Sequence, residues 1–170
     1  MDLKSAIRTF PDYPAPGIMF RDITTLLKDG EALAYAINQM ADTLEGLDFD
    51  IIIAPESRGF IFGVPLAVKL GKGFVPARKK GKLPADTISK SYALEYGQET
   101  IEIHADAVKP GQRVVIVDDL LATGGTCKAL CELVEQSGGE VAAIVFLIEL
   151  DGLQGRKLLE GYNIKTILNY

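Results

Sequence analysis

Two adjacent acids and a turn of small residues follow a strongly apolar run in the second half of the chain. The run covers residues 114–117, the acids are Asp118 and Asp119, and the turn is residues 122–126. Backbone N–H groups of small residues can converge at a helix N-terminus, where the helix dipole favours an anion such as a phosphate monoester. Acids at the carboxyl end of a parallel strand lie where open α/β sheets bind ligands, and they can accept hydrogen bonds from sugar hydroxyls. The pattern predicts a site for a phosphorylated sugar.

The individual residues of the turn suit this task. Thr123 and Thr126 add hydroxyl donors, and Gly124 and Gly125 tolerate the positive φ angles that such loops demand. The alternative is an ordinary strand and helix start with accidental acids and glycines. Two adjacent acids at a strand end have no packing role, so the ligand site is the favoured interpretation.

A second group of residues that could bind a ligand is basic. It comprises Arg78, Lys79, Lys80 and Lys82, interrupted by Gly81. Composition alone leaves two alternatives open, a solvated loop face and a binding site for phosphates. Arg58 stands apart from this group, and its planar guanidinium fork can bond two phosphate oxygens together.

Short β-branched runs alternate along the chain with helix-length segments. This alternation indicates an α/β domain with a mainly parallel, twisted sheet flanked by helices, which would position these residues. We expect strands at 50–55, 73–76, 113–117 and 141–148, an edge strand at 164–168, and helices at 30–44, 60–70 and 125–137. A polar, lysine-rich stretch at 78–91 precedes a hairpin of 92–95 and 100–103 around Gly97.

Size and composition exclude several classes of protein. The 170 residues, 48% hydrophobic and 24% charged, fit a single globular domain spanning 1–170, and a net charge of -5 argues against general nucleic-acid binding. No apolar run approaches the roughly 20 residues of a membrane span, so we expect a cytoplasmic protein. Cys127 and Cys131 have helical spacing and are expected to be buried and reduced. His104 is the only histidine, which excludes a histidine-rich metal site.

The apolar run, the acid pair and the turn 122–126 together resemble the phosphoribosyl pyrophosphate signature of type I phosphoribosyltransferases. Four further motifs resemble the adenine phosphoribosyltransferases in particular, and they lie at residues 10–23, 56–60, 78–84 and 92–97. The first is similar to the N-terminal base-binding hood of that group. Several members carry aspartate where this chain has Glu56. The resemblance spans nearly the whole chain and implies a hood at about 1–29, a core at about 30–170 and a mobile catalytic loop at about 78–100.

The resemblance also implies roles for individual residues. Substrate contacts would come from Met19, Phe20, Arg21, Glu56, Ser57, Arg58, Gly59, Arg78, Lys79, Lys82, Tyr96, Leu120, Ala122, Thr123, Gly124, Gly125 and Thr126, and catalytic groups from Glu95, Asp118, Asp119 and Arg58. Residues 19–21 would line the adenine pocket, with Leu120 covering the other face of the base. The loop cations would meet pyrophosphate, and Glu95 would act near adenine N7. A cis peptide is expected between Glu56 and Ser57.

The implied reaction is attack of adenine N9 on the anomeric carbon of phosphoribosyl pyrophosphate, giving AMP and diphosphate. Mg²⁺ would be held through substrate and water near Asp118 and Asp119, with no direct protein ligand assigned. The implied partners are the two substrates and a second copy of the chain in a homodimer, with neither nucleic acid nor membrane. Two alternatives stay open. One is a phosphoribosyltransferase for another purine base, and the other is a non-enzymatic regulator that senses phosphoribosyl pyrophosphate.

Overall fold

The structure is a computed structural model that describes residues 1–94 and 96–170. The chain forms two compact units, Met1–Gln39 and Met40–Tyr170. The boundary between them falls inside helix α2 (Gly30–Asp42). Among the described residues, no helix combines the length and the apolar character needed to cross a membrane.

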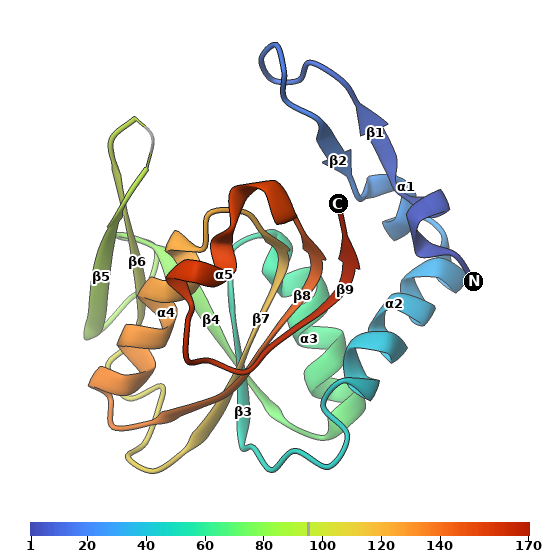
Figure 1. The fold of residues 1–170 in the computed structure, drawn as a ribbon. Coiled ribbons are helices and arrows are strands. Elements are labelled where there is room, and N and C mark those ends of the chain that lie inside the picture. The colour runs from blue at the N-terminus through green and yellow to red at the C-terminus, as the bar shows by residue number, and fades with distance from the viewer. Residues whose placement is uncertain (95) are drawn as a thin grey trace. The chain divides into compact units, whose positions relative to one another are not determined.

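The first unit is built around a small antiparallel hairpin, drawn in blue in Figure 1. A short 3-10 helix (Leu3–Ala6) precedes strand β1 (Arg8–Phe10), which pairs with β2 (Phe20–Asp22), and helix α1 (Thr24–Leu27) follows. The sequence predicted a base-binding hood here but no strands, because three-residue strands give too short an alternation to detect. The hairpin holds the predicted base-binding residues at its second strand.

The second unit contains a seven-stranded sheet with the order β5-β6-β4-β3-β7-β8-β9 among the described residues. The strands β3, β4, β7, β8 and β9 pair in parallel, and β5 and β6 extend the sheet in antiparallel fashion. Their bounds are β3 Ile51–Pro55, β4 Gly73–Lys79, β5 Thr87–Ala93, β6 Gln98–His104, β7 Arg113–Leu121, β8 Glu140–Glu149 and β9 Ile164–Asn169. This arrangement confirms the predicted mainly parallel α/β fold and the predicted edge strand.

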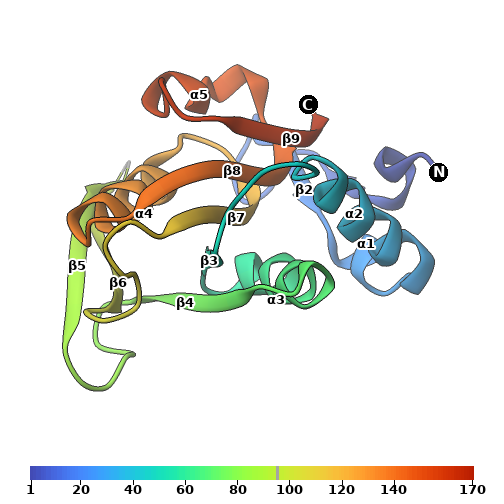
Figure 2. The same cartoon turned by 90° about the horizontal axis from the view of Figure 1, so that it is seen from below.

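Helices cover both faces of this sheet (Figure 2). Helix α4 (Gly125–Gln136) buries Leu130 and Cys131 in a cluster that includes Ile53 of β3. Helix α3 (Arg58–Leu70) packs on the opposite face, because a Cβ at its Gly63 would lie 2.9 Å from that of Ala54, the residue after Ile53. The C-terminal part adds a 3-10 turn (Asp151–Leu153) and helix α5 (Gly155–Leu158).

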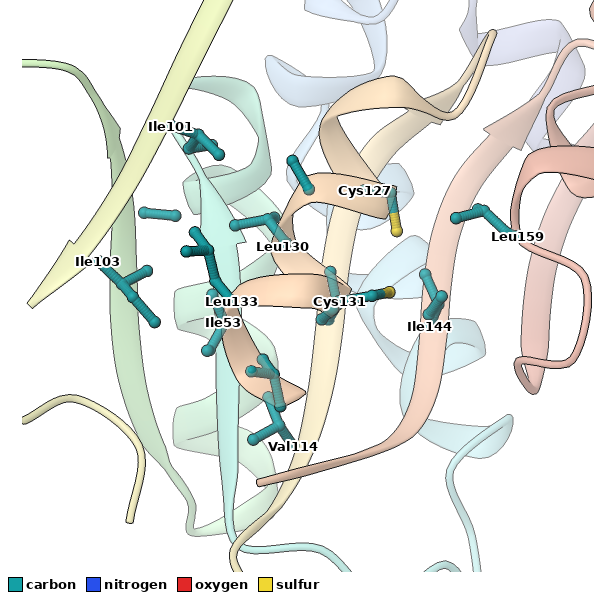
Figure 3. Packing of buried hydrophobic residues seen from close by; sticks show 14 of the residues in the cluster. Ile53, Ile101, Ile103, Val114, Cys127, Leu130, Cys131, Leu133, Ile144 and Leu159 are labelled. Atoms are coloured by element: carbon teal, nitrogen blue, oxygen red, sulfur yellow. The ribbon is translucent and has the colours of Figure 1, made fainter. Parts of the chain in front are cut away.

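The two cysteines lie inside the cluster between α4 and the sheet (Figure 3). Both are free and buried, as predicted. A hydrogen bond with Cys131, followed by burial, raises the pKa of the Cys127 thiol well above its ordinary value. Both side chains are therefore part of the apolar core, and Cys127 stays a protonated thiol.

Three predicted boundaries are wrong, and the sheet explains all of them. Strand β4, predicted at 73–76, continues to Lys79, because Arg78 and Lys79 pair with β6. Residues 87–91, predicted as loop, belong to β5, where Ile88 and Tyr92 pack against the core while the residues between them are polar. Pairing with the more apolar β6 fixes this weakly amphipathic strand. Strand β7 continues past the predicted end at 117 to Leu121, because Asp118 and Leu120 still pair with β8. The acid pair therefore lies within a regular strand.

Candidate active site

A cavity of about 520 Å³ opens in the second unit at the carboxyl ends of β3 and β7. It is polar in character, which suits a charged ligand better than a purely apolar one. Its lining residues are Pro55, Glu56, Ser57, Arg58, Lys79, Tyr92, Glu99, Ile101, Asp118, Asp119, Leu120, Ala122 and Thr126. Most of these were predicted from sequence as site residues, so the structure brings the predicted acids, turn and pyrophosphate motif together.

The acid pair forms one wall of the cavity. Asp119 is almost fully buried, and its Oδ2 lies 2.8 Å from Nε of Arg58. Asp118 accepts a 2.8 Å hydrogen bond from the Asp119 N–H. Burial, followed by the neighbouring negative charge of Asp119, raises the pKa of Asp118 well above its ordinary value. Asp118 therefore ionises less readily than an ordinary aspartate, and a cation or a hydroxyl donor bound beside it would favour its charged form.

Gly59 allows helix α3 to begin directly beside the acids. A Cβ at this position would lie 2.8 Å from Pro55 Cδ and 3.1 Å from Asp118 Oδ1. The peptide between Glu56 and Ser57 that leads into this helix is cis, as predicted. Ser57 is the N-cap of α3 and makes no side-chain capping bond. The start of α3 therefore has no side-chain cap, and its residues Ser57 and Arg58 line the cavity.

The small-residue turn lines an adjoining pocket of about 80 Å³ that shares Asp118, Leu120, Ala122 and Thr126 with the larger cavity. Gly124 is the N-cap of α4 in the left-handed region, with φ of 89°, and offers no capping side chain. The helix N-terminus is therefore left open for an anion. Thr123, Gly124 and Gly125, which were predicted from sequence as site residues, also line this pocket.

Strand β5 reaches this turn through Tyr92. The Thr126 hydroxyl donates to the Tyr92 hydroxyl over 3.0 Å, and a Cβ on Gly125 would lie 3.2 Å from the Tyr92 ring. Burial raises the pKa of Tyr92, so the phenol stays neutral. Tyr92 belongs to the motif at 92–97 that resembles the family, but Tyr92 itself was not predicted as a site residue.

Cations of the basic group form ion pairs with two carboxylates, Arg78 and Lys82 with Glu56 and Lys79 with Glu99. Glu56 accepts hydrogen bonds from Arg78 Nε at 3.0 Å, the Lys79 N–H at 2.8 Å and Lys82 Nζ at 3.0 Å. Burial alone would raise the pKa of Glu56, but these three donors outweigh it and lower the pKa to about 2. Within the described chain, Arg78 and Lys82 do not line the cavity, whereas Lys79 does. The structure thus gives Glu56 the role of holding the basic segment.

Lys79 meets an acid that sequence reasoning missed. Its Nζ lies 2.9 Å from Glu99 Oε1 of β6, and this contact raises the pKa of Lys79. The cross-strand pairs Tyr92 with Glu99 and Lys79 with Ile101 place all four side chains on one sheet face. Only the register of the hairpin brings them together, and local sequence carries no independent signal for that register.

The predicted base-binding residues lie in the first unit. A pocket of about 390 Å³ is lined there by Phe10, Tyr13, Phe20, Asp22 and Thr24. Tyr13 packs edge-on against Phe20 at 5.2 Å between ring centroids. Met19 is half exposed, and Arg21 donates to the Thr9 hydroxyl over 2.8 Å. The pocket is mainly aromatic and therefore suited to a flat heterocycle.

Two further predicted residues, in addition to Arg78 and Lys82, cannot be assigned to the cavity. Glu95 lies outside the described residues. Tyr96 is almost fully exposed and is not among the residues lining the cavity in the described chain.

Glu56 makes the stability of the fold dependent on pH. Its folded pKa of about 2 lies below the ordinary value of 4.5, so its contribution is complete above that value and is lost as the pH falls from 4.5 toward 2. We expect Glu56→Gln to lower the free energy of unfolding at pH 7 and to have progressively less effect below about pH 4.5. Urea unfolding between about pH 7 and pH 3 measures this difference. Glu160→Gln, at an exposed carboxylate, is the control, and an effect of Glu56→Gln that does not change with pH would contradict this role.

Comparison with known proteins gives the family. The sequence profile of the phosphoribosyl transferase domain matches residues 19–168. The adenine phosphoribosyltransferase of Lachnoclostridium phytofermentans is 58% identical over 168 residues, which cover 99% of this chain and 97% of that protein. The chain belongs to the adenine phosphoribosyltransferases, within the phosphoribosyl transferase family. The predicted family and its enzyme class, pentosyl transfer, are confirmed.

Solved structures agree with this assignment. The crystal structure of adenine phosphoribosyltransferase from Thermoanaerobacter pseudethanolicus matches with a TM-score of 0.96 and 58% identity, covering 99% of this chain and 98% of that one. The enzyme from Saccharomyces cerevisiae, solved with an imino-altritol bisphosphate and adenine, matches with a TM-score of 0.91 and 38% identity, covering 97% and 96% of the two chains. The phosphoribosyltransferase-like fold is thereby confirmed.

Proposed function

We propose that the protein transfers the 5-phosphoribosyl group of phosphoribosyl pyrophosphate to N9 of adenine, releasing diphosphate and forming AMP for purine salvage. The observation that carries this proposal is the shared cavity in which the acid pair, Arg58 and the open N-terminus of α4 meet. A phosphorylated sugar needs these three groups together, and neither a purely structural strand end nor an ordinary helix start requires them.

The 5-phosphate would occupy the turn 122–126. There the N–H groups at the start of α4, the helix dipole and the hydroxyls of Thr123 and Thr126 would bind its oxygens. The ribose hydroxyls would then reach Asp118 and Asp119 on the adjoining strand. Holding the sugar at both ends fixes its anomeric carbon in front of the attacking nitrogen, and this fixed geometry raises the rate of displacement.

Departure of diphosphate places positive charge on the ribose ring and negative charge on the leaving group. The carboxylates of Asp118 and Asp119 would stabilise the first, because they are largely withdrawn from solvent. Arg58, Lys79 and the N–H groups at the start of α3 would bind the second. No covalent enzyme intermediate is required, and inversion at the anomeric carbon follows from direct displacement.

Magnesium fits this cavity as a substrate-bound ion. Within residues 1–94 and 96–170 no group of three or more His, Cys, Asp or Glu side chains could hold a metal. Mg²⁺ is commonly bound by one or two carboxylates together with substrate oxygens and water, and Asp118 and Asp119 provide such carboxylates. When bound, the ion would neutralise charge on the leaving diphosphate.

For the base, we propose contacts from Met19, Phe20 and Arg21 of the hood at about residues 1–29, and from Leu120. The aromatic pocket of the first unit and the presence of Leu120 in the cavity of the second support this assignment. Glu95 would assist near N7. Assembly as a homodimer and location in the cytoplasm stay predictions.

We also propose that the segment at about 78–100 closes over the substrates. Its exposed polar surface and its ion pair between Lys79 and Glu99 support a movable cover that responds to anions. Hydrogen exchange followed by mass spectrometry should find residues 80–86, which connect β4 to β5, the fastest-exchanging internal segment of the free protein. Phosphoribosyl pyrophosphate with Mg²⁺ should slow them by about tenfold. Slow exchange in both states would contradict a mobile cover.

The product assay tests the proposed reaction. The protein, Mg²⁺, adenine and phosphoribosyl pyrophosphate should give AMP and diphosphate in equal amounts. A sensor without turnover would bind phosphoribosyl pyrophosphate and form neither product, and simple hydrolysis would give ribose 5-phosphate without AMP.

A further inference from the structure

Helix α5 (Gly155–Leu158) lies directly against the small-residue turn. A Cβ at Gly155 would collide with the carbonyl oxygen of Ala122 and would lie 2.8 Å from Leu121 Cδ1. Conversely, a Cβ at Gly124 would lie 2.9 Å from the carbonyl oxygen of Gly155. The two backbones are therefore in contact without a side chain between them, so a displacement of α5 moves the turn.

An ion pair between the half-exposed Arg156 and the buried Glu149 ties α5 to the end of β8. Arg156 Nε lies 2.7 and 2.9 Å from the two carboxylate oxygens of Glu149, whose side chain is only 7% exposed. Asn169 Nδ2 donates to the same carboxylate over 3.3 Å. Glu149 is buried and Arg156 is its only charged partner among the described contacts, so removing Arg156 would leave a buried carboxylate without its charged partner.

The acidic member of this ion pair, Glu149, lies beside the end of the strand that leads into the turn. Glu149 is the last residue of β8 and lies opposite Leu121, the last residue of β7. The next residue, Leu150, donates its N–H to the carbonyl oxygen of Leu121 over 3.0 Å. Leu159, just after α5, points toward Cys127 of α4 (Figure 3) and is fully buried in the same cluster. The turn is thus held between the end of β7, the start of α4 and α5.

We propose that Arg156, through its ion pair with Glu149, and Gly155, through backbone contact, are positioning residues for the phosphate-binding turn. Arg156 does not line either pocket of the site in the described chain, so it acts on the ligand only through Ala122 and Gly124. The inference rests on the proposed function, since it assigns the 5-phosphate to this turn. Precise placement of such a turn matters because small shifts of binding groups reduce affinity and rate strongly.

The test compares two halves of the substrate as separate probes. Binding of ribose 5-phosphate reports on the turn, and binding of diphosphate with Mg²⁺ reports on the part of the cavity near Arg58. For Arg156→Met we expect the Kd of ribose 5-phosphate to rise about tenfold and that of diphosphate to change by less than about twofold. Arg156→Lys should recover part of the loss, and Gly155→Ala should produce a loss at least as large.

Lys157→Met is the matched control, because it removes one positive charge from the same helix at an exposed position. It should leave both Kd values unchanged, whereas equal losses in Lys157→Met and Arg156→Met would assign the effect to long-range charge and overturn the proposal. Unchanged binding of ribose 5-phosphate by folded Arg156→Met and Gly155→Ala, or equal losses for both probes, would also overturn it. If the unmodified protein bound diphosphate but not ribose 5-phosphate, the assignment of the turn itself, and with it the proposed function, would fail instead.

Discussion

Replacing Asp118 and Asp119 together by asparagine is expected to reduce AMP formation by at least about a thousandfold. The amide groups keep the shape of the cavity and can still accept hydrogen bonds, but they remove the negative charge that would face the developing positive charge on the ribose. They also remove the carboxylates proposed to lie near magnesium. The backbone N–H of residue 119 can still donate to the side chain of residue 118, so the strand should keep its geometry.

The same double variant should lose little stability, and the reason lies in the pKa of Asp118. Because its folded pKa is raised, the ionised form destabilises the fold, and stability is lost as the pH rises from the ordinary value of 3.8 toward the folded pKa. The substitution Asp118→Asn removes this cost at neutral pH. The substitution Asp119→Asn gives up the ion pair with Arg58, whose side chain is half exposed. That ion pair therefore contributes about 1 kcal/mol or less.

Rates of AMP formation and urea unfolding curves measure the two effects on one preparation. Asp118→Asn alone should raise the free energy of unfolding at neutral pH, and Asp119→Asn alone should lower it slightly. Near-normal activity in a folded double variant would remove the acids from the mechanism. A large loss of stability would instead show that the pair has a structural role.

Arg58→Met is expected to lower kcat/KM by about a hundredfold, because one cation facing the leaving diphosphate is lost. In contrast to the acid double variant, it should also destabilise the protein by about 1 kcal/mol, since Asp119 is buried and loses its ion pair with Arg58. Arg58→Lys keeps the charge without the planar fork and should recover only part of the activity.

Lys80→Met is the control for Arg58, because Lys80 is an exposed member of the basic segment and does not line the cavity in the described chain. It should leave kcat/KM within about twofold of normal, as surface charges contribute little. Steady-state rates with varied phosphoribosyl pyrophosphate give the comparison. Equal losses for Arg58→Met and Lys80→Met would mean that general charge, not the position of Arg58, governs the rate.

The strand ends and the turn were predictable from sequence because each is local. An apolar run, an acid pair and small residues adjoin in the chain, and β7 and α4 place them as their periodicity indicates. Arg58 was likewise predictable, because it lies between a buried strand and an apolar helix. The neighbouring Gly59 lacks a Cβ, and this absence lets α3 start close to Asp118.

The remaining contacts depend on pairings between distant segments, which local patterns do not encode. Tyr92, Glu99 and Lys79 meet only because the register of β5, β6 and β4 aligns them. The contact of Gly155 with the turn joins residues far apart in the chain. Glu56 was predicted to contact substrate, yet its carboxylate binds cations of the basic segment in the structure, because a largely buried acid takes the nearest cations available.

The choice of base tests the central claim most directly. The protein, Mg²⁺ and phosphoribosyl pyrophosphate are incubated with adenine, hypoxanthine or guanine in separate reactions, and nucleotide formation is followed. We predict a kcat/KM for adenine at least about a hundredfold above that for either 6-oxo purine. A site whose polar groups pair with the 6-amino group of adenine would leave those groups unpaired against the 6-oxo group of hypoxanthine or guanine. Equal or faster turnover of hypoxanthine or guanine would contradict this claim.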